Sequence, residues 1–180
     1  MKHSRLSVHG RFQPVLHLNH WNYIKYAFDS AEHVTIYITN PDRDESHEET
    51  ASWRSNPENN PFSYEQREAM FHAFFSAKGV KPNRYAIKPL NIKDPKSIAS
   101  IDKHSPMVVN VYSDWSAKKV ELFDAAGVST VVIRQQKIDG ISGTKIRKVL
   151  AEDGEGQDEK LLQAGIMLEA LDGLKAFVNR

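Results

Sequence analysis

Short apolar strands that alternate with amphipathic helices are the feature that most constrains the fold of this chain. Runs rich in β-branched and aromatic residues predict strands at residues 6–10, 33–38, 85–87, 107–112 and 129–133. Apolar residues at helical spacing predict intervening helices at residues 18–31, 63–79, 116–126 and 142–152. This order predicts an α/β fold with a doubly wound, mainly parallel five-stranded sheet and helices on both faces. In such a sheet, ligands bind beyond the carboxyl ends of the strands, where the strand order reverses.

Local signals define the helix that is predicted to begin after Ser63. Ser63 and Gln66 have the spacing of a capping box, and Gly79 stands where a left-handed residue commonly ends a helix. Its buried stripe is expected to be Met70, Phe71, Phe74 and Phe75. After a main domain over residues 1–156, apolar residues on one face predict a C-terminal helix over 157–180 that packs on the same domain: Met167, Leu171, Leu174 and Val178.

Charge and composition exclude several classes of protein. The 24 Lys and Arg residues nearly balance the 23 Asp and Glu residues, so bulk positive charge cannot drive nucleic-acid binding. The chain has no cysteine, which excludes a disulfide scaffold, a thiolate metal site and a cysteine nucleophile. No apolar run approaches the roughly 18 residues that span a bilayer, and the first residues do not resemble a signal peptide. We therefore expect a cytoplasmic protein with no nucleic-acid or membrane partner; whether it self-associates is left open.

The loop after the first predicted strand, residues 10–20, carries two histidines and an arginine. His17 and His20 lie three residues apart at a predicted helix start, where unpaired backbone N–H groups favour an anion. Arg11 adds a planar guanidinium suited to phosphate oxygens, and Gly10 lets the backbone approach a ligand closely. The loop therefore predicts a phosphate site.

A second loop, after the fifth predicted strand, repeats this arrangement. Ser142 is a good N-cap, Gly143 keeps the first helical turn open, Thr144 offers a hydroxyl, and Arg147 follows about one turn later. Two anion sites at the same edge of the sheet, each with a helix N-terminus and an arginine, suit a triphosphate better than a single phosphate. Lys145 and Lys148 either contribute to this site or are simply solvated.

Each signal also has an ordinary interpretation. A His-x-x-His pair fits a metal site or two unrelated histidines, and Ser-Gly-Thr is a common helix cap. No third ligand stands at a fixed spacing from the two histidines, so no metal site formed by the protein is predicted. The two loops together, each after a predicted strand, favour a nucleotide site.

The two loops resemble the signature motifs of the nucleotidyltransferase superfamily. The first is similar to Gly-Arg-Phe-Gln-Pro-x-His-x-Gly-His, and residues 141–147 are similar to Ile-Ser-Ser/Gly-Thr-x-Ile-Arg. Within the superfamily, the chain most resembles archaeal-type nicotinamide-nucleotide adenylyltransferases over about residues 6–150. Weaker matches occur at residues 45–47, at 60–63 with Arg67, and at 112–113.

The resemblance implies a Rossmann-like fold and transfer of a nucleoside monophosphate from a triphosphate to a phosphate-bearing small molecule, with release of pyrophosphate. His17 and His20 would stabilise the leaving charge, and Arg11 and Arg147 would clamp phosphates, which Mg²⁺ would bridge. The other nucleotide-binding residues would be Gly10, Phe12, Gln13, Ser142, Gly143 and Thr144. The leading reaction is synthesis of NAD from ATP and nicotinamide mononucleotide.

Three departures from the family pattern leave the base and the acceptor open. Asn19 replaces the motif glycine between the histidines, the segment 39–61 is longer than expected, and residues 89–105 match no acceptor-binding region. The alternatives are a cytidylyltransferase or adenylyltransferase that uses another phosphate or phosphonate acceptor, and a nucleotide sensor without catalysis.

Three residues are candidates for contact with the acceptor: Trp115, Asn60 and Trp53. Trp115 follows the fourth predicted strand and stands at the edge of the sheet where ligands bind. Trp53 lies in the polar segment 39–61, which is either a lid over the site or a surface insertion; its ring could equally be a packing anchor.

Overall fold

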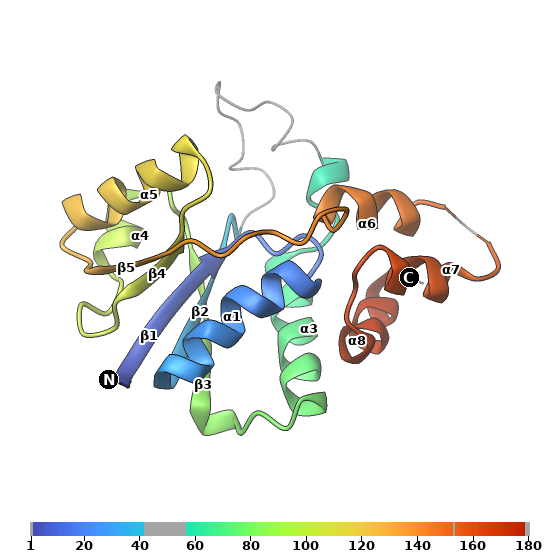
Figure 1. Cartoon of the computed structure of the whole chain (residues 1–180), viewed down its shortest axis with the longest axis horizontal. Helices are drawn as coiled ribbons and strands as arrows, with labels where there is room; N and C mark the ends of the chain where they lie inside the picture. The colour runs from blue at the N-terminus through green and yellow to red at the C-terminus, as the bar shows by residue number, and fades with distance from the viewer. Residues whose placement is uncertain (1, 42–56, 153, 179–180) are drawn as a thin grey trace. The chain divides into compact units, whose positions relative to one another are not determined.

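The computed structural model describes residues 2–41, 57–152 and 154–178 (Figure 1). These residues form two compact units, each built from separate stretches of chain. The first unit comprises residues 1–11, 22–39 and 81–136, and the second comprises residues 12–21, 40–80 and 137–180.

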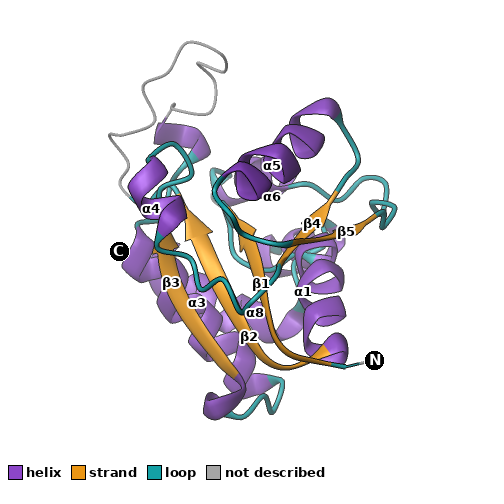
Figure 2. Ribbon diagram, turned by 90° about the vertical axis from the view of Figure 1, so that its left-hand side faces the viewer, coloured by secondary structure: helices purple, strands orange, loops and turns teal. Residues whose placement is uncertain are grey.

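A five-stranded, wholly parallel sheet forms the centre of the first unit (Figure 2). Its order is β3-β2-β1-β4-β5, so the strand order reverses between β1 and β4. The strands are β1 (His3–Gly10), β2 (Ala31–Thr39), β3 (Tyr85–Leu90), β4 (Met107–Asn110) and β5 (Thr130–Ile133). All five strands predicted from the sequence are present, and the prediction of a doubly wound parallel sheet is confirmed.

Both faces of the sheet are buried, as the apolar runs of the strands predicted. On one face, Tyr37, Met107 and Val109 pack in a cluster with Phe123 and Ile98. Phe123 comes from α5 (Asp114–Ala125), and Ile98 from α4 (Pro95–Ala99). The alternate strand residues point to the opposite face and are fully buried: Leu6, Val8, Val34, Ile36, Ile38 and Val108.

A tyrosine hydroxyl bridges β1 and β4 where the strand order reverses. Ser7 of β1 pairs with Met107 of β4 in the parallel ladder. Further along, the backbone N–H of His9 donates to the Tyr23 hydroxyl (3.2 Å), which donates to the Val108 carbonyl (2.5 Å). Tyr23 belongs to α1 (Leu18–Ser30). The Tyr23 hydroxyl therefore links the two strands beyond the Ser7–Met107 pair.

The second unit is helical. It contains the first turn of α1, the short 3-10 helix η2 (Pro57–Asn59), α3 (Tyr64–Ala77), α6 (Gly143–Leu150), α7 (Gln157–Gln163) and α8 (Leu168–Val178). The predicted capping box of Ser63 and Gln66 is present, Gly79 has φ of +69°, and the four residues of the predicted stripe are buried. Helix α3 packs against α8, and Lys78 pairs with Glu169 between them (2.7 Å).

Two features differ from the sequence prediction. Helix α4 was not predicted, because five residues capped by the Asp94 side chain are too short to show a periodic pattern. The single helix expected over 157–180 is instead the pair α7 and α8, because Gly165 between them has φ of +97° and interrupts the helix. The division into domains 1–156 and 157–180 remains a prediction.

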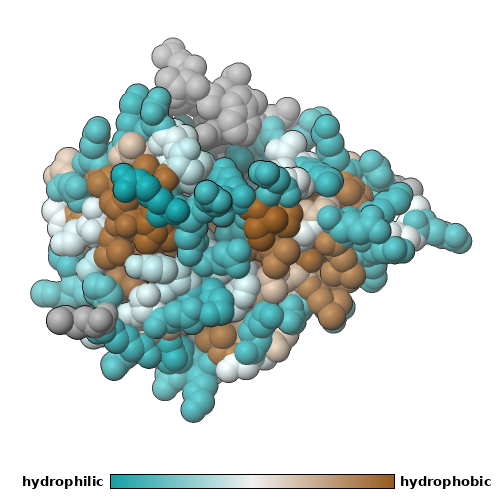
Figure 3. Space-filling view, in the orientation of Figure 1, coloured by the Kyte–Doolittle hydropathy of each residue, from teal (hydrophilic) through white to brown (hydrophobic). Residues whose placement is uncertain are grey.

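Apolar side chains reach the surface in both units, and Figure 3 shows hydrophobic areas over β5 and over α8. Val132 in β5 is 43% exposed, and Leu168 in α8 is 67% exposed. Among the helices of the described residues, none has the length and apolar character needed to cross a bilayer.

Candidate active site

The predicted histidines meet at the start of α1. Their rings stack with centroids 3.6 Å apart and an interplanar angle of 22°. The Nδ1 of His17 accepts a hydrogen bond from the backbone N–H of His20 (3.4 Å), so the His17 ring occupies the position of an N-cap. Phe12 supports the pair, because its buried ring lies edge-on to His20 and to Phe71, with centroids 5.0 Å away in each case.

Burial keeps His17 neutral. It lowers the pKa of His17 to about 4, and the nearby charge of Lys137 acts in the same direction. A neutral imidazole that accepts at Nδ1 carries its proton on Nε2. His17 can therefore offer an N–H donor to a phosphate oxygen at neutral pH without bearing a charge of its own.

Arg147 joins the second motif loop to the first. Its Nη1 donates to the Gln13 carbonyl (2.7 Å), and its Nη2 donates to the Asn59 side chain (2.8 Å) and to the Thr144 hydroxyl (3.1 Å). Partial burial lowers the pKa of Arg147, and the group still carries its charge at neutral pH. Because a guanidinium has five N–H groups, N–H groups remain for a phosphate to engage.

Gly143 allows the two loops to approach each other closely. A Cβ at this position would lie 2.6 Å from the Gln13 carbonyl oxygen and 3.1 Å from Nη1 of Arg147. The backbone of the first loop therefore leaves no room for a side chain at the first turn of α6, where Gly143 stands. Ser142 is the N-cap of α6, as predicted, and its side chain accepts from the N–H of Lys145 (3.3 Å).

The turn between α7 and α8 supports both loops from a part of the chain to which no site residue was assigned. Gly165 accepts from the N–H of Leu18 (3.0 Å), and Ile166 forms an antiparallel bridge with His17. A Cβ at Gly165 would lie 2.7 Å from the side chain of Ile141, which begins the second motif. The C-terminal helices are thus part of the framework that holds the two motif loops.

The other predicted site residues that the structure describes are divided between the two units. Gln13 is buried, and its side-chain amide exchanges two hydrogen bonds with the backbone of Phe62 (2.7 and 3.2 Å). Asn60 is buried in the second unit. Gly10, Arg11 and Trp115 belong to the first unit, and Trp115 is 47% exposed in the first turn of α5. Trp53 and most of the segment 39–61 lie outside the described residues, as does the weak match at 45–47.

Sequence reasoning missed two features of the site. It did not name Asn59, whose side chain accepts a hydrogen bond from Arg147. It also passed over an extra residue: Val15 and Leu16 both stand between Pro14 and His17, where the motif has one residue. Leu16 has φ of +62°, a left-handed conformation that is uncommon outside glycine. Comparison of the motif spacing alone would have revealed this insertion.

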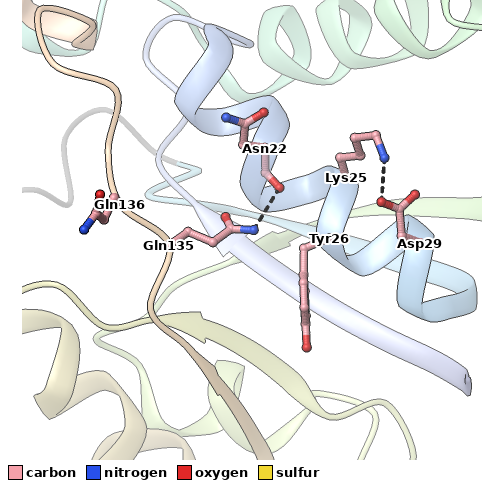
Figure 4. A pocket seen from close by; sticks show the side chains of 6 residues that line it. All are labelled: Asn22, Lys25, Tyr26, Asp29, Gln135 and Gln136. Carbon is pink, nitrogen blue, oxygen red and sulfur yellow. Dashed lines mark hydrogen bonds and ion pairs between the residues drawn. The ribbon is translucent and has the colours of Figure 1, made fainter. Parts of the chain in front are cut away.

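A separate cavity of about 430 Å³ lies in the first unit (Figure 4). It is lined by Asn22, Lys25, Tyr26, Asp29, Gln135 and Gln136, none of which was predicted as a site residue. Lys25 and Asp29 already form an ion pair, and the Gln135 amide donates to the Asn22 carbonyl (3.4 Å). The side chains of Lys25, Asp29 and Gln135 thus already have partners at this cavity.

Within the part of the chain that the structure describes, no group of three or more His, Asp or Glu side chains could hold a metal ion. The donors of the motif loops are N–H and hydroxyl groups. Such a set fits the phosphates of a metal–nucleotide complex better than the metal itself.

Comparisons with known proteins agree with this architecture. The model of the cytidylyltransferase-like family matches residues 8–149. A phosphonoformate cytidylyltransferase from Streptomyces viridochromogenes is 33% identical over 147 residues, which cover 81% of this chain and 79% of that protein.

Two solved structures share the fold. A bifunctional NMN adenylyltransferase/ADP ribose pyrophosphatase from Francisella tularensis has a TM-score of 0.66 at 20% identity, covering 98% of this chain and 50% of that one. A second structure of such a bifunctional enzyme from the same organism, complexed with AMP and Mn ion, has a TM-score of 0.58 at 22% identity, covering 86% and 44%. This chain therefore spans about half the length of those enzymes or less.

The family match covers most of the chain and includes both motif loops. The parallel sheet is the Rossmann-like fold expected for it. The alternative of a binding protein without catalysis is set aside. The chain belongs to the cytidylyltransferase-like family and is a nucleotidyltransferase.

Proposed function

We propose that this enzyme transfers a cytidylyl group from CTP to a small phosphonate or phosphate acceptor and releases pyrophosphate. The observation that carries the proposal is the junction of the two motif loops in the second unit. Arg147 on one loop donates to the Gln13 carbonyl on the other (2.7 Å), and the stacked histidines belong to the same loop as Gln13. A single polyphosphate that engages both loops would meet two helix N-termini and a guanidinium.

Each motif residue has a role in this proposal. The Nε2–H of His17, together with His20, would donate to oxygens of the β- and γ-phosphates. Arg147 would neutralise charge on the same phosphates, while Ser142 and Thr144 would donate through hydroxyl or backbone groups. Arg11 and Gly10 are proposed to complete the phosphate contacts, as the family motif implies.

The reaction is an in-line displacement at phosphorus. An acceptor oxygen attacks the α-phosphorus, a new P–O bond forms, and the bond from the α-phosphorus to the bridging oxygen of pyrophosphate breaks. The attacking oxygen is already anionic, so no general base is required. Catalysis then depends on positioning and on stabilisation of the leaving charge. Mg²⁺, bound through the nucleotide phosphates, would neutralise part of that charge.

The choice of CTP and a phosphonate is supported by the cytidylyltransferase relative, which is 33% identical over most of both chains. Adenylyl transfer from ATP to nicotinamide mononucleotide is the second candidate. It is supported by the archaeal-type motif resemblance and by the names of the structures that share the fold. Because those structures are only 20–22% identical to this chain, we rank this reaction second.

A matrix of substrates tests the proposal. The enzyme is incubated with Mg²⁺, one of CTP, ATP, GTP or UTP, and one of phosphonoformate, other small phosphonates or nicotinamide mononucleotide. Pyrophosphate release is followed continuously, and the products are identified by mass spectrometry. We expect release with CTP and a phosphonate, with a product one cytidylyl group heavier than the acceptor. Formation of NAD from ATP would establish the second candidate instead, and no release with any pair would refute both.

A further inference from the structure

Asn19 stands between the two histidines, where the family motif has glycine, and its side chain points to the other motif loop. Its Oδ1 accepts from the backbone N–H of Ile138 (2.8 Å). Its Nδ2 donates to the carbonyl of Ile138 (3.2 Å) and to the carbonyl of Ile141 (3.1 Å). One side-chain amide thus makes three hydrogen bonds to a single stretch of backbone.

That stretch is a tight turn that leads directly into α6. The N–H of Ile141 donates to the Ile138 carbonyl (3.4 Å), and Gly140 within the turn has φ of +78°. Residues 136–140 are all exposed, so burial contributes little to holding them in place. The next residue after the turn is Ser142, the N-cap of α6. Asn19 therefore binds both ends of the turn that sets the position of the second anion site.

We propose that Asn19 is a positioning residue for nucleotidyl transfer. Its amide ties the turn 138–141 to the first turn of α1, so that His17, His20 and the N-terminus of α6 face the same triphosphate. Asn19 acts through these backbone groups and does not itself contact the nucleotide. The inference rests on the proposed function, because it assumes that one polyphosphate engages both loops.

The chemistry of the side chain explains why asparagine suits this position. The turn requires one acceptor and two donor contacts at a fixed reach, which a primary amide supplies. Alanine and glycine supply none of them. Aspartate supplies the acceptor for Ile138 but turns the two carbonyl contacts into repulsions. The three variants therefore separate the acceptor bond from the donor bonds.

Kinetics test the positioning role. For Asn19→Ala and Asn19→Gly, we expect kcat/KM for the triphosphate to fall at least tenfold, while KM for the acceptor stays within twofold of wild type. Asn19→Asp should be no more active than Asn19→Ala. Asn22→Gly serves as the control, because it places a glycine at an exposed position of the same helix and should stay within twofold. Triphosphate kinetics that are unchanged in Asn19→Ala, or wild-type activity in Asn19→Asp, would overturn the proposal.

Two measurements on the free protein do not depend on which substrates are correct. Amide hydrogen exchange at Ile138 should accelerate at least tenfold in Asn19→Ala and stay slow in Asn19→Asp, which retains the acceptor. Binding of inorganic tripolyphosphate, measured by calorimetry, should weaken at least fivefold in Asn19→Ala. Unchanged exchange and unchanged binding would refute the role of Asn19, even if the enzyme proves to transfer a cytidylyl group. If both change as expected but no substrate pair reacts, it is the proposed function that fails.

A final comparison separates positioning from direct reading of the base. The ratio of kcat/KM for CTP and for ATP should be the same in the wild type and in Asn19→Ala, because the lost bonds are to the protein. A shift of that ratio by more than tenfold would mean that Asn19 contacts the nucleotide, which contradicts the proposal.

Discussion

Gly143 lets the two motif loops approach each other because it has no side chain. We expect Gly143→Ala to lower kcat/KM at least tenfold and the free energy of unfolding by about 1–3 kcal/mol, because its Cβ would collide with the Gln13 carbonyl. At an unobstructed helix position, the same change would stabilise the protein. Glu152→Ala, an exposed change just beyond the same helix, should leave both values near wild type. Urea unfolding and pyrophosphate release measure the two effects, and a stabilised, active Gly143→Ala would contradict this account.

The role of His20 is tested by its removal. His20→Ala should lower kcat about 100- to 1000-fold, the typical effect of losing one donor to a developing charge. The protein should remain folded, as judged by its thermal unfolding midpoint. His72 on α3 is exposed and provides the matched control, since His72→Ala should turn over at the wild-type rate. A His20→Ala enzyme with full activity would remove His20 from the mechanism.

At the scale of elements, the turn between α7 and α8 should matter for catalysis although it follows the region matched by the family model. Gly165→Ala would place a Cβ 2.7 Å from Ile141 and strain a backbone with φ of +97°. We expect a fall in kcat of tenfold or more, because Gly165 and Ile166 hold the backbone around His17. Leu168→Ala, three residues later and exposed, should have little effect. Equal activities of the two variants would show that the turn does not position His17.

The hydroxyl of Tyr23 offers a second test at this scale. Tyr23→Phe leaves the His9 N–H and the Val108 carbonyl without their bridge in a buried place. The free energy of unfolding should fall by about 2–3 kcal/mol, because unsatisfied buried polar groups are costly. Tyr26→Phe on the same helix is the control and should change stability by less than about 0.5 kcal/mol. Urea unfolding of the wild type, Tyr23→Phe and Tyr26→Phe measures these free energies. Equal stability of the two variants would contradict the bridging role of the Tyr23 hydroxyl.

Most elements could be predicted from the sequence because their signals are local. The strands are apolar runs, and α3 has a complete cap and a periodic stripe. Two kinds of feature could not be predicted: elements too short to show a periodic pattern, and breaks that depend on contacts distant in the sequence. Five residues of α4 show no period, and the break at Gly165 looks like one more position of a long amphipathic helix until its packing against Ile141 is known.

The same distinction applies to the candidate site. The motif residues could be named from spacing, because a helix N-terminus with histidines or arginine is a local pattern. The bonds that hold them are long-range: Asn19 to Ile138, Arg147 to Asn59, and Leu18 to Gly165. In the sequence, Asn19 is only a departure from the motif glycine that leaves the base and the acceptor open. Its side chain instead binds the neighbouring turn, which no pattern in the sequence indicated.

At the scale of the whole molecule, two buried histidines should make the fold sensitive to acid. Burial lowers the pKa of His17 to about 4 and holds the pKa of His9 well below its usual value. Between pH 6.5 and 4, the unfolded chain binds protons that the folded chain does not, so stability falls as the pH is lowered. For His17 alone, the loss between pH 7 and pH 5 should be about 2 kcal/mol.

Urea unfolding at the two pH values measures this loss. His17→Asn keeps an acceptor for the His20 N–H but does not titrate, so its loss of stability over the same range should be about 2 kcal/mol smaller than that of the wild type. Identical pH dependence of the two proteins would show that His17 is not neutral and buried in the folded state.

The chain passes from one compact unit to the other five times, after residues 11, 21, 39, 80 and 136. No contiguous fragment therefore corresponds to either unit, and a single recombination event between related genes could not exchange one unit while keeping the other. The two motif loops and the sheet must be inherited together. Chimaeras made to alter substrate choice would need several crossovers at once, placed at these five junctions.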